Sequence, residues 1–518
     1  MKKLIVLTLA CAVAASVFAG GQSSGGQGAA SSAPFTTSNS TYASYDLKTP
    51  VTLYMYMLGD VPKDLDEVLA KANAEYFQPM LNTTLKMVFL SWSDYQTKYP
   101  LVLAAGEDVD IMFTALWAFY EQESGKGSFL ELTPEFISKW MPTINKQQTA
   151  ISWSQAKTGG KVYAIPTIAS NPDYKYLGIR EDLRIKYNLP PINSWDTLEQ
   201  FLFTIAANEP SIQAYAAPGE APEVLWVYLE SRNVLYAGAP IYYIWNNQNR
   251  NEPTAQELSF MYTSDVFRDF ALEMAEWSSK GVWSRNVMNN TIAQGDSFTQ
   301  GKSASVFWNS TVFSLGKTME EQNGVGKAGY YDASPTVPTR KETYDNNMWA
   351  IVSSSRYQER AALALDLMKT HTPLTILLQS GIEGRHYISQ GGNWFIPGPE
   401  AADYANNAWG WALNRPETLV ESYDTTKYTQ RYALEISINE RLFEPKIDGF
   451  RFDRRNVANE WAVISALIEE YTPSFECGVY GVQTQAKFDE FKAKVETAGL
   501  AKLTSEFQTQ YAAFLRDN

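Results

Sequence analysis

The chain contains few residues that could form disulfides or bind zinc. Its 518 residues include two cysteines, Cys11 and Cys477, and two histidines, His371 and His386. Cys11 lies in a segment that we expect to be removed, so the mature chain would have no internal disulfide and would depend on core burial for stability. Two histidines argue against a zinc site of the usual type and against Ser–His catalysis. We therefore predict neither a metal nor a cofactor.

Positive charge is also scarce. The formal net charge is −14, and removal of Lys2 and Lys3 with the N-terminal segment makes it −16. Nucleic acids and anionic lipid surfaces are bound through basic patches. The composition therefore argues against both as partners.

The N-terminal segment resembles a secretory signal peptide. Lys2 and Lys3 precede an apolar run over residues 4–18, which ends in small residues that allow cleavage after Ala19. The run is too short for a typical membrane-spanning helix. We expect a signal peptide at 1–19, a flexible Gly/Ser-rich linker at 20–45, and a periplasmic or extracellular location. Cys11 could instead be a lipid-attachment site, although the apolar core before it would then be very short.

The chain is rich in apolar and aromatic residues. Hydrophobic residues make up 45% of the chain and aromatic residues 14%, with 15 Trp and 30 Tyr. This composition and length are typical of a globular protein with two or three domains. Many of these rings belong in a core, but Trp and Tyr at this density also suit a sugar-binding surface.

The first part of the chain alternates strand and helix patterns. We expect strands at 51–58, 83–90 and 111–114, separated by helices at 63–77 and 93–105. This β-α-β-α-β order predicts a parallel sheet covered by helices. Ser194 is expected to cap a helix, an amphipathic helix is expected at 265–280, and the last third, from about residue 406, is expected to be mostly helical.

Several motifs in a fixed order resemble a known family. They are DIMFT (110–114), GSFLELTP (127–134), GKVYAIP (160–166), YLGIREDL (176–183), PINSWDTL (191–198) and GKSASVFW (301–308). Their order and spacing are similar to those of the extracellular solute-binding proteins of carbohydrate ABC importers, the family that includes maltose-binding protein. LGD (58–60), GIEGRHY (381–387) and NVANE (456–460) further resemble a subgroup of large, lipoprotein-like members with a helical C-terminal domain of unknown function.

This resemblance implies an α/β, two-lobed, type II periplasmic-binding-protein fold with a helical C-terminal extension. The N-terminal lobe would comprise residues 46–165 and 330–400, and the C-terminal lobe residues 166–329 and 401–518. A saccharide would bind between the lobes of a monomer without being chemically altered, and the protein would deliver it to the permease subunits of the transporter. Members usually carry a lipid-attached cysteine; Cys11 fits that position poorly, which puts the anchor in doubt.

Candidate ligand-binding residues lie at the ends of expected strands, where open α/β sheets bind ligands. Asp60 follows the first strand and could accept two hydroxyl groups, or simply cap a helix. The resemblance places a ligand-facing loop at Trp117 and a stacking aromatic at Trp308, with Asn309 beside it. Trp117 could instead be a core residue under a helix.

Further candidates are less distinctive. Tyr176 borders the entry to the second lobe, and Trp349 lies on a returning strand that either reaches the cleft or fills the core. Glu383 and His386 share a glycine-shaped turn that could grip a polar ligand or be ordinary structure. Trp394, Trp409 and Trp411 could extend the cleft wall, although each alone is more typical of packing.

Two other functions fit the same composition. A secreted glycoside hydrolase would also be acidic and rich in Trp, but it needs a pair of carboxylates across the scissile bond, and the sequence singles out no such pair. A peptide-binding receptor would share the two-lobed fold.

Overall fold

The structure is a computed structural model that describes residues 35–517, apart from 93, 107, 169–170, 218–222, 238–240, 247–249, 393, 405–419 and 422–428. The expected signal peptide, Cys11, Trp409 and Trp411 lie outside the described residues. The last part of the expected linker, residues 35–45, is within the described residues. It contains the short helix η1 (Ser40–Tyr42), and the buried Tyr42 hydroxyl donates to Asp366 Oδ2 at 3.0 Å.

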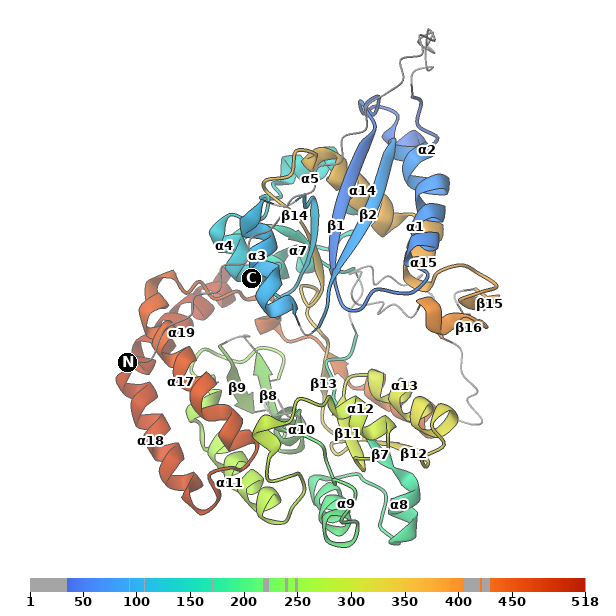
Figure 1. The fold of residues 1–518 in the computed structure, drawn as a ribbon. Helices are drawn as coiled ribbons and strands as arrows, with labels where there is room; N and C mark the ends of the chain where they lie inside the picture. Colours follow the sequence, from blue (N-terminus) through green and yellow to red (C-terminus); the bar gives the residue numbers. More distant parts are fainter. Residues whose placement is uncertain are drawn as a thin grey trace, which may run out of the picture.

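The first lobe is built on a five-stranded sheet of order β2-β1-β3-β14-β6 (Figure 1). Its parallel part consists of β1 (Val51–Leu58), β2 (Thr83–Leu90) and β3 (Ile111–Thr114), which confirms the expected parallel sheet. The returning strand β14 (Met348–Ile351) pairs with β3 in the antiparallel direction. The edge strand β6 (Ala164–Ile165) pairs antiparallel with β14 and so runs in the same direction as β1–β3.

Helices lie on both sides of this sheet (Figure 1). Helix α1 presents a buried stripe of Leu65, Val68, Leu69 and Ala72, the spacing expected of one helical face. The helices of the lobe are α1 (Leu65–Ala72), α2 (Gln78–Leu81), α3 (Tyr95–Ala105), α4 (Tyr120–Lys126), α5 (Pro134–Trp140), α6 (Ile144–Gln147), α7 (Ala150–Gln155), α14 (Gln358–Thr370) and α15 (Thr372–Ser380). A hairpin of β15 (Tyr387–Gly391) and β16 (Trp394–Pro397) projects from the lobe.

The second lobe contains two three-stranded sheets. One has the order β11-β7-β12, with β7 (Tyr176–Arg180) between β11 (Ser305–Trp308) and β12 (Ala328–Tyr331); the other has the order β10-β9-β8, from β8 (Val234–Ala237), β9 (Tyr243–Asn246) and β10 (Ser259–Phe260). Its helices are α8 (Glu181–Lys186), α9 (Trp195–Asn208), α10 (Val224–Ser231), α11 (Asp265–Ser279), α12 (Gln294–Thr299) and α13 (Thr311–Lys317). Ser194 caps α9 through a reciprocal capping box with Thr197, as expected.

The C-terminal helices pack on the second lobe. They are α16 (Thr429–Glu440), α17 (Ala458–Glu476), α18 (Thr484–Thr497) and α19 (Leu500–Asp517), of which α17 and α18 lie against α11. They share one buried cluster with the lobe, and the Phe507 ring stacks on Tyr243 at 3.8 Å between centroids. The second lobe and the last helices therefore form one packed unit.

A ribbon of short strands joins the two lobes. β13 (Thr339–Arg340) pairs with β18 (Leu442–Phe443), and the segment before β7 joins β13 through the Asp173 N–H, which donates to the Arg340 carbonyl at 2.8 Å. The chain therefore crosses between the lobes in adjacent, hydrogen-bonded segments. The expected lobe boundaries stay a prediction; β12, which includes the expected boundary at 330, pairs within the second lobe.

Among the helices of the described residues, none has the length and hydropathy of a membrane span.

Candidate functional site: the cleft between the lobes

A cavity of about 420 Å³ lies where the two lobes and the C-terminal segment meet. This volume is within the range of small-molecule sites, which favour domain interfaces. Its lining comes from distant parts of the chain and includes Leu116, Trp117 and Glu121 of the first lobe; Tyr174, Lys175, Trp226, Tyr236, Tyr242 and Asn309 of the second; Asp173, Arg340, Glu342 and Asn346 of the crossing segments; and Ile447, Asp448, Phe450, Arg451, Phe452, Arg454 and Phe507 of the C-terminal region.

Aromatic rings form one wall of the cavity. The Trp226 ring on α10 lies 4.6 Å from Tyr236 and 5.1 Å from Tyr242, between centroids, and all three side chains are half-buried. The first lobe adds Trp117, which is 39% exposed and whose Nε1 donates to the Asn346 carbonyl at 2.9 Å. Such a wall offers ring faces to a ligand that has an apolar face of its own.

Arg340 is the polar centre of the cavity. Its Nη2 donates to Asp173 Oδ2 at 2.6 Å, and its Nη1 lies 3.4 Å from Asp448 Oδ1 and donates to the Tyr236 carbonyl. Two buried atoms of this group have no hydrogen-bond partner among the described residues: Arg340 Nε, a donor, and Asp448 Oδ2, an acceptor. Buried polar atoms are normally paired, so this donor and acceptor favour a polar ligand at this point.

Burial raises the pKa of three carboxyl groups in the lining. The pKa of Glu342 rises to about 7 and that of Asp448 to about 7, in both cases mainly because burial disfavours the charged form; Asp173 nearby adds repulsion, and Arg340 opposes the shift at Asp448. Burial also raises the pKa of Glu121, against the attraction of Arg454. At neutral pH, Glu342 and Asp448 are thus near their titration points, and each can accept or donate a hydrogen bond.

The structure places two predicted residues in the lining of this cavity, Trp117 and Asn309. Trp308 adjoins Asn309 at the end of β11, is 36% exposed, and has the Lys175 Nζ 5.8 Å from its ring centroid. Asp60 is exposed at the end of β1 but is not part of the lining. Whether any of these residues binds a ligand stays a prediction.

Two predicted site residues are buried in the core and are not part of the cavity lining, so their role in ligand binding stays a prediction. Trp349 is 0% exposed on β14, where its ring meets Phe113 edge-on at 5.7 Å. Tyr176 is buried between Tyr174 and Phe313, with ring centroids 5.1 and 4.9 Å away. Both lie on strands that have neighbours on either side, so their side chains fill the interior of a lobe.

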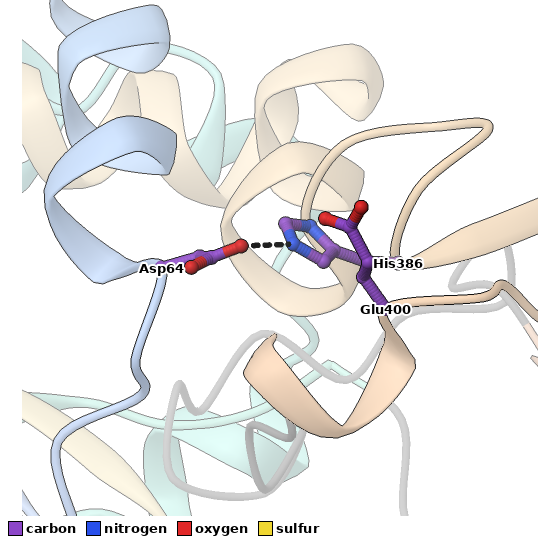
Figure 2. A group of neighbouring side chains, drawn as sticks. All are labelled: Asp64, His386 and Glu400. Atoms are coloured by element: carbon purple, nitrogen blue, oxygen red, sulfur yellow. Dashed lines mark hydrogen bonds and ion pairs between the residues drawn. The ribbon is translucent and has the colours of Figure 1, made fainter.

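Glu383 and His386 are also outside the cavity. Glu383 is exposed in its turn, whereas His386 is buried against Asp64 at the start of α1. Figure 2 shows His386 with Asp64 and Glu400, whose ligand atoms all lie within 4.8 Å of one another. The predicted turn is real, but it faces the body of the first lobe.

The donor set of this cluster does not fit a metal. His386 Nδ1 accepts the Ile382 N–H at 2.8 Å, so the neutral ring carries its proton on Nε2, the atom that faces Asp64 at 3.2 Å. A metal on Nε2 would require the proton on Nδ1, against that N–H. The Arg385 guanidinium already binds Asp64 at 2.8 Å and Glu400 at 2.5 Å. The cluster therefore holds residues 385–400 against the start of α1 through hydrogen bonds and ion pairs, and we call it the polar lock.

Sequence reasoning missed most of the cavity. The aromatic trio of Trp226, Tyr236 and Tyr242 comes from α10, β8 and the approach to β9, and none of these residues carries a motif. Arg340 and Glu342 lie in the crossing ribbon. Arg451 and Arg454, in the charged stretch 451–455, also line the cavity, and no motif marks them as ligand-binding residues.

Comparisons with known proteins agree with this architecture. Residues 446–516 match the family model described as "Domain of unknown function (DUF3502)". The "Carbohydrate ABC transporter substrate-binding protein" of Streptococcus pneumoniae serotype 4 is 23% identical over 517 residues, 93% of this chain and 94% of that protein.

Solved structures share the fold. The N-glycan transport solute binding protein (NgtS) from Streptococcus pneumoniae in complex with Man1GlcNAc has a TM-score of 0.70 at 20% identity and covers 90% of this chain and 100% of its own. The alginate-binding protein AlgQ2 without calcium ion has a TM-score of 0.64 at 16% identity and covers 89% and 98%. The predicted type II fold is thus confirmed: the chain has the two-lobed architecture of these solute-binding structures, and its residues 446–516 match the DUF3502 model.

Proposed function

We propose that the chain is the substrate-binding subunit of an ABC importer and captures a neutral oligosaccharide in the cleft between its lobes. The observation that carries this proposal is the cavity, which combines an aromatic wall with the unpaired Arg340 Nε and Asp448 Oδ2. A sugar ring matches both features, because its apolar face stacks on aromatic rings while one hydroxyl group can accept from Arg340 and donate to Asp448.

The charges of the lining favour a neutral sugar over an acidic one. Four carboxylates and four cations line the cavity, and each cation has a carboxylate partner: Lys175 pairs with Glu223, Arg340 with Asp173, Arg451 with Asp345, and Arg454 with Glu121. A uronic-acid ligand would have to take a cation from its partner and leave a buried carboxylate unpaired, which is unfavourable.

In the proposed function the protein delivers the sugar without making or breaking a covalent bond. The protein would work outside the cytoplasm as a monomer after loss of residues 1–19, or anchored through Cys11 if that residue is lipidated, and would hand the sugar to the permease subunits. The names of the relatives support this reading, since they describe carbohydrate and N-glycan binding by ABC transporter components.

Isothermal titration calorimetry tests the proposal directly. The panel would contain Man1GlcNAc, neutral glucans, alginate oligosaccharides and short peptides, and the recovered ligand would be checked for cleavage. We expect a neutral oligosaccharide to bind tightly and to be recovered intact. Binding of peptides alone would replace the proposal with a peptide receptor, and a cleaved product would replace it with a hydrolase.

A matched pair of Trp variants locates the site. Trp226→Leu removes a ring from the aromatic wall while keeping an apolar side chain, and we expect it to weaken binding by roughly tenfold, about 1.4 kcal/mol. Trp394→Leu, at a residue 49% exposed on the β15–β16 hairpin and outside the lining, is the control and should leave the affinity unchanged. Equal affinities for the two variants would place the ligand elsewhere.

A further inference from the structure

The segment that opens the DUF3502 domain is fixed to the second lobe. We call residues 446–457 the bridging segment. At its start, Lys446 donates its N–H to the Asn251 carbonyl at 2.7 Å and its Nζ lies 2.8 Å from Glu252. Further along, the Asp453 N–H donates to Gln510 on α19 at 2.9 Å. The segment therefore moves with the second lobe and its helices.

The middle of the bridging segment reaches the first lobe through Arg451. Its Nε donates to the Gln155 carbonyl at the end of α7 at 2.8 Å and to Asp345 Oδ2 at 3.0 Å. Asp345 is fully buried beside the crossing ribbon. Its Nη1 donates to the carbonyls of Asp448 and Phe450 at 2.8 Å, and its Nη2 also pairs with Asp345, so all three guanidinium nitrogens have acceptors.

A second arginine of the bridging segment, Arg454, also contacts the first lobe. Arg454 Nη2 forms an ion pair with Glu121 Oε2 on α4 of the first lobe. Both side chains are mostly buried, at 28% and 21% exposure, so the pair is screened less than a surface salt bridge. In Figure 1 the C-terminal helices lie beside the second lobe and extend toward α4.

These contacts constrain how the lobes can move. Opening of the cleft rotates the first lobe relative to the second lobe and everything packed on it, as in other two-lobed binding proteins. Such a rotation would separate Arg454 from Glu121 and would move Gln155 away from Arg451. The bridging segment also lines the cavity, with Asp448, Phe450 and Arg451 among others.

We propose that the bridging segment of the DUF3502 domain is a latch: Arg454 on Glu121, with Arg451 on Gln155 and Asp345, holds the lobes in the arrangement that binds the ligand. A protein whose binding-competent state is fully populated binds with its intrinsic affinity, whereas a partly open protein binds more weakly in proportion to the closed fraction. The latch thus sets the sugar affinity without requiring contact between Arg454 and the sugar. The affinity part of this inference rests on the proposed function; the lobe arrangement does not.

Spin labels on the two lobes measure the latch directly. The full chain would carry Cys11→Ser with labels at Leu101→Cys on α3 and Ile185→Cys on α8, both residues being 61% exposed. The remaining Cys477 is buried and would stay unlabelled. In the ligand-free protein we expect Arg454→Met or Glu121→Gln to increase the population at longer interlobe distance relative to the unmodified chain, and we expect Man1GlcNAc, or another sugar found to bind, to return that population to the shorter distance.

Affinity and coupling provide the second readout. We expect Arg454→Met to weaken sugar binding by about threefold to tenfold, and Glu121→Gln to add little once Arg454 is gone, because both changes break the same pair. Arg455→Met is the control: this neighbour is 81% exposed, pairs within the segment with Asp453, and should change neither distance nor affinity.

Two results would overturn the latch. The first is an interlobe distance in Arg454→Met and Glu121→Gln that equals the distance in the Arg455→Met control. The second is an interlobe distance in Arg454→Met and Glu121→Gln that is shorter than in that control. If no saccharide binds the unmodified protein, the proposed function fails, and the distances still decide whether the latch exists.

Discussion

Arg340 lies where the crossing ribbon meets the cavity, and Arg340→Met removes its charge while keeping most of its length. The change breaks the ion pair with Asp173 and the weaker one with Asp448, and it removes the donor to the Tyr236 carbonyl. Breaking a buried ion pair by removing one partner typically destabilises a protein by about 3–5 kcal/mol, because a buried charge loses its compensation. We expect a loss of this size at pH 8.5.

The loss should be smaller at low pH. Burial already raises the pKa of Asp448 to about 7, above the ordinary value of 3.8, and Arg340 opposes this shift. A carboxyl group with a raised pKa destabilises the folded protein as the pH rises from the unfolded pKa through the folded one. At pH 5 Asp448 is protonated in the folded protein with or without Arg340, so only the lost hydrogen bonds and the Asp173 pair remain, and the loss should be smaller than at pH 8.5 by about 1–2 kcal/mol.

Urea unfolding of the ligand-free protein at pH 5 and pH 8.5, followed by Trp fluorescence, measures both values. Arg356→Met is the control, because Arg356 is 80% exposed, lies 3.7 Å from Asp108, and should contribute less than about 0.5 kcal/mol at either pH. A loss below about 1 kcal/mol at pH 8.5, or an equal loss at both pH values, would refute the assignment of Arg340 as the compensating charge.

Two further predictions concern stability elsewhere. Gly301→Ala should destabilise the protein by about 2–4 kcal/mol, because Gly301 has φ +71° and an added Cβ would lie 2.2 Å from Val325 Cγ1. The control Gly281→Ala, at φ +78° with open space around it, should lose only about 1 kcal/mol. Thermal unfolding compares the two variants, and equal shifts in melting temperature would show that Val325 moves aside without cost. His386→Leu should destabilise by about 1–3 kcal/mol, because it leaves the Ile382 N–H unpaired and removes one of the two partners of Asp64, of which Arg385 remains. EDTA should leave the melting temperature of the unmodified protein unchanged; a fall with EDTA would contradict the polar lock.

Local sequence patterns predict the elements that local physics determines. The strand expected at 51–58 has the same bounds in β1, and Ser194 caps its helix because the capping box is contained within four residues. Trp117 could be placed at the cleft because it follows a strand whose carboxyl end faces the second lobe. Each of these inferences needs only near neighbours in the chain.

The other site residues depend on pairings that no local pattern contains. Trp349 is buried because β14 inserts between β3 and β6, strands that are far from it in the sequence. Arg340 becomes the centre of the cavity because β13 pairs with β18, about a hundred residues later in the chain. The fold class was therefore predictable, whereas most of the lining was not.

The stacking of Phe507 on Tyr243 determines where this protein can be truncated without exposing its core. The family model begins at residue 446, but the structure has no physical boundary there, since α17–α19 and the second lobe bury a common set of side chains. A fragment limited to the matched residues would expose one half of that interior, and a chain truncated before them would expose the other. In this protein the segment matched by the family model does not coincide with the unit that folds. Any engineered exchange of the C-terminal helices must therefore include the residues of the second lobe that pack against them.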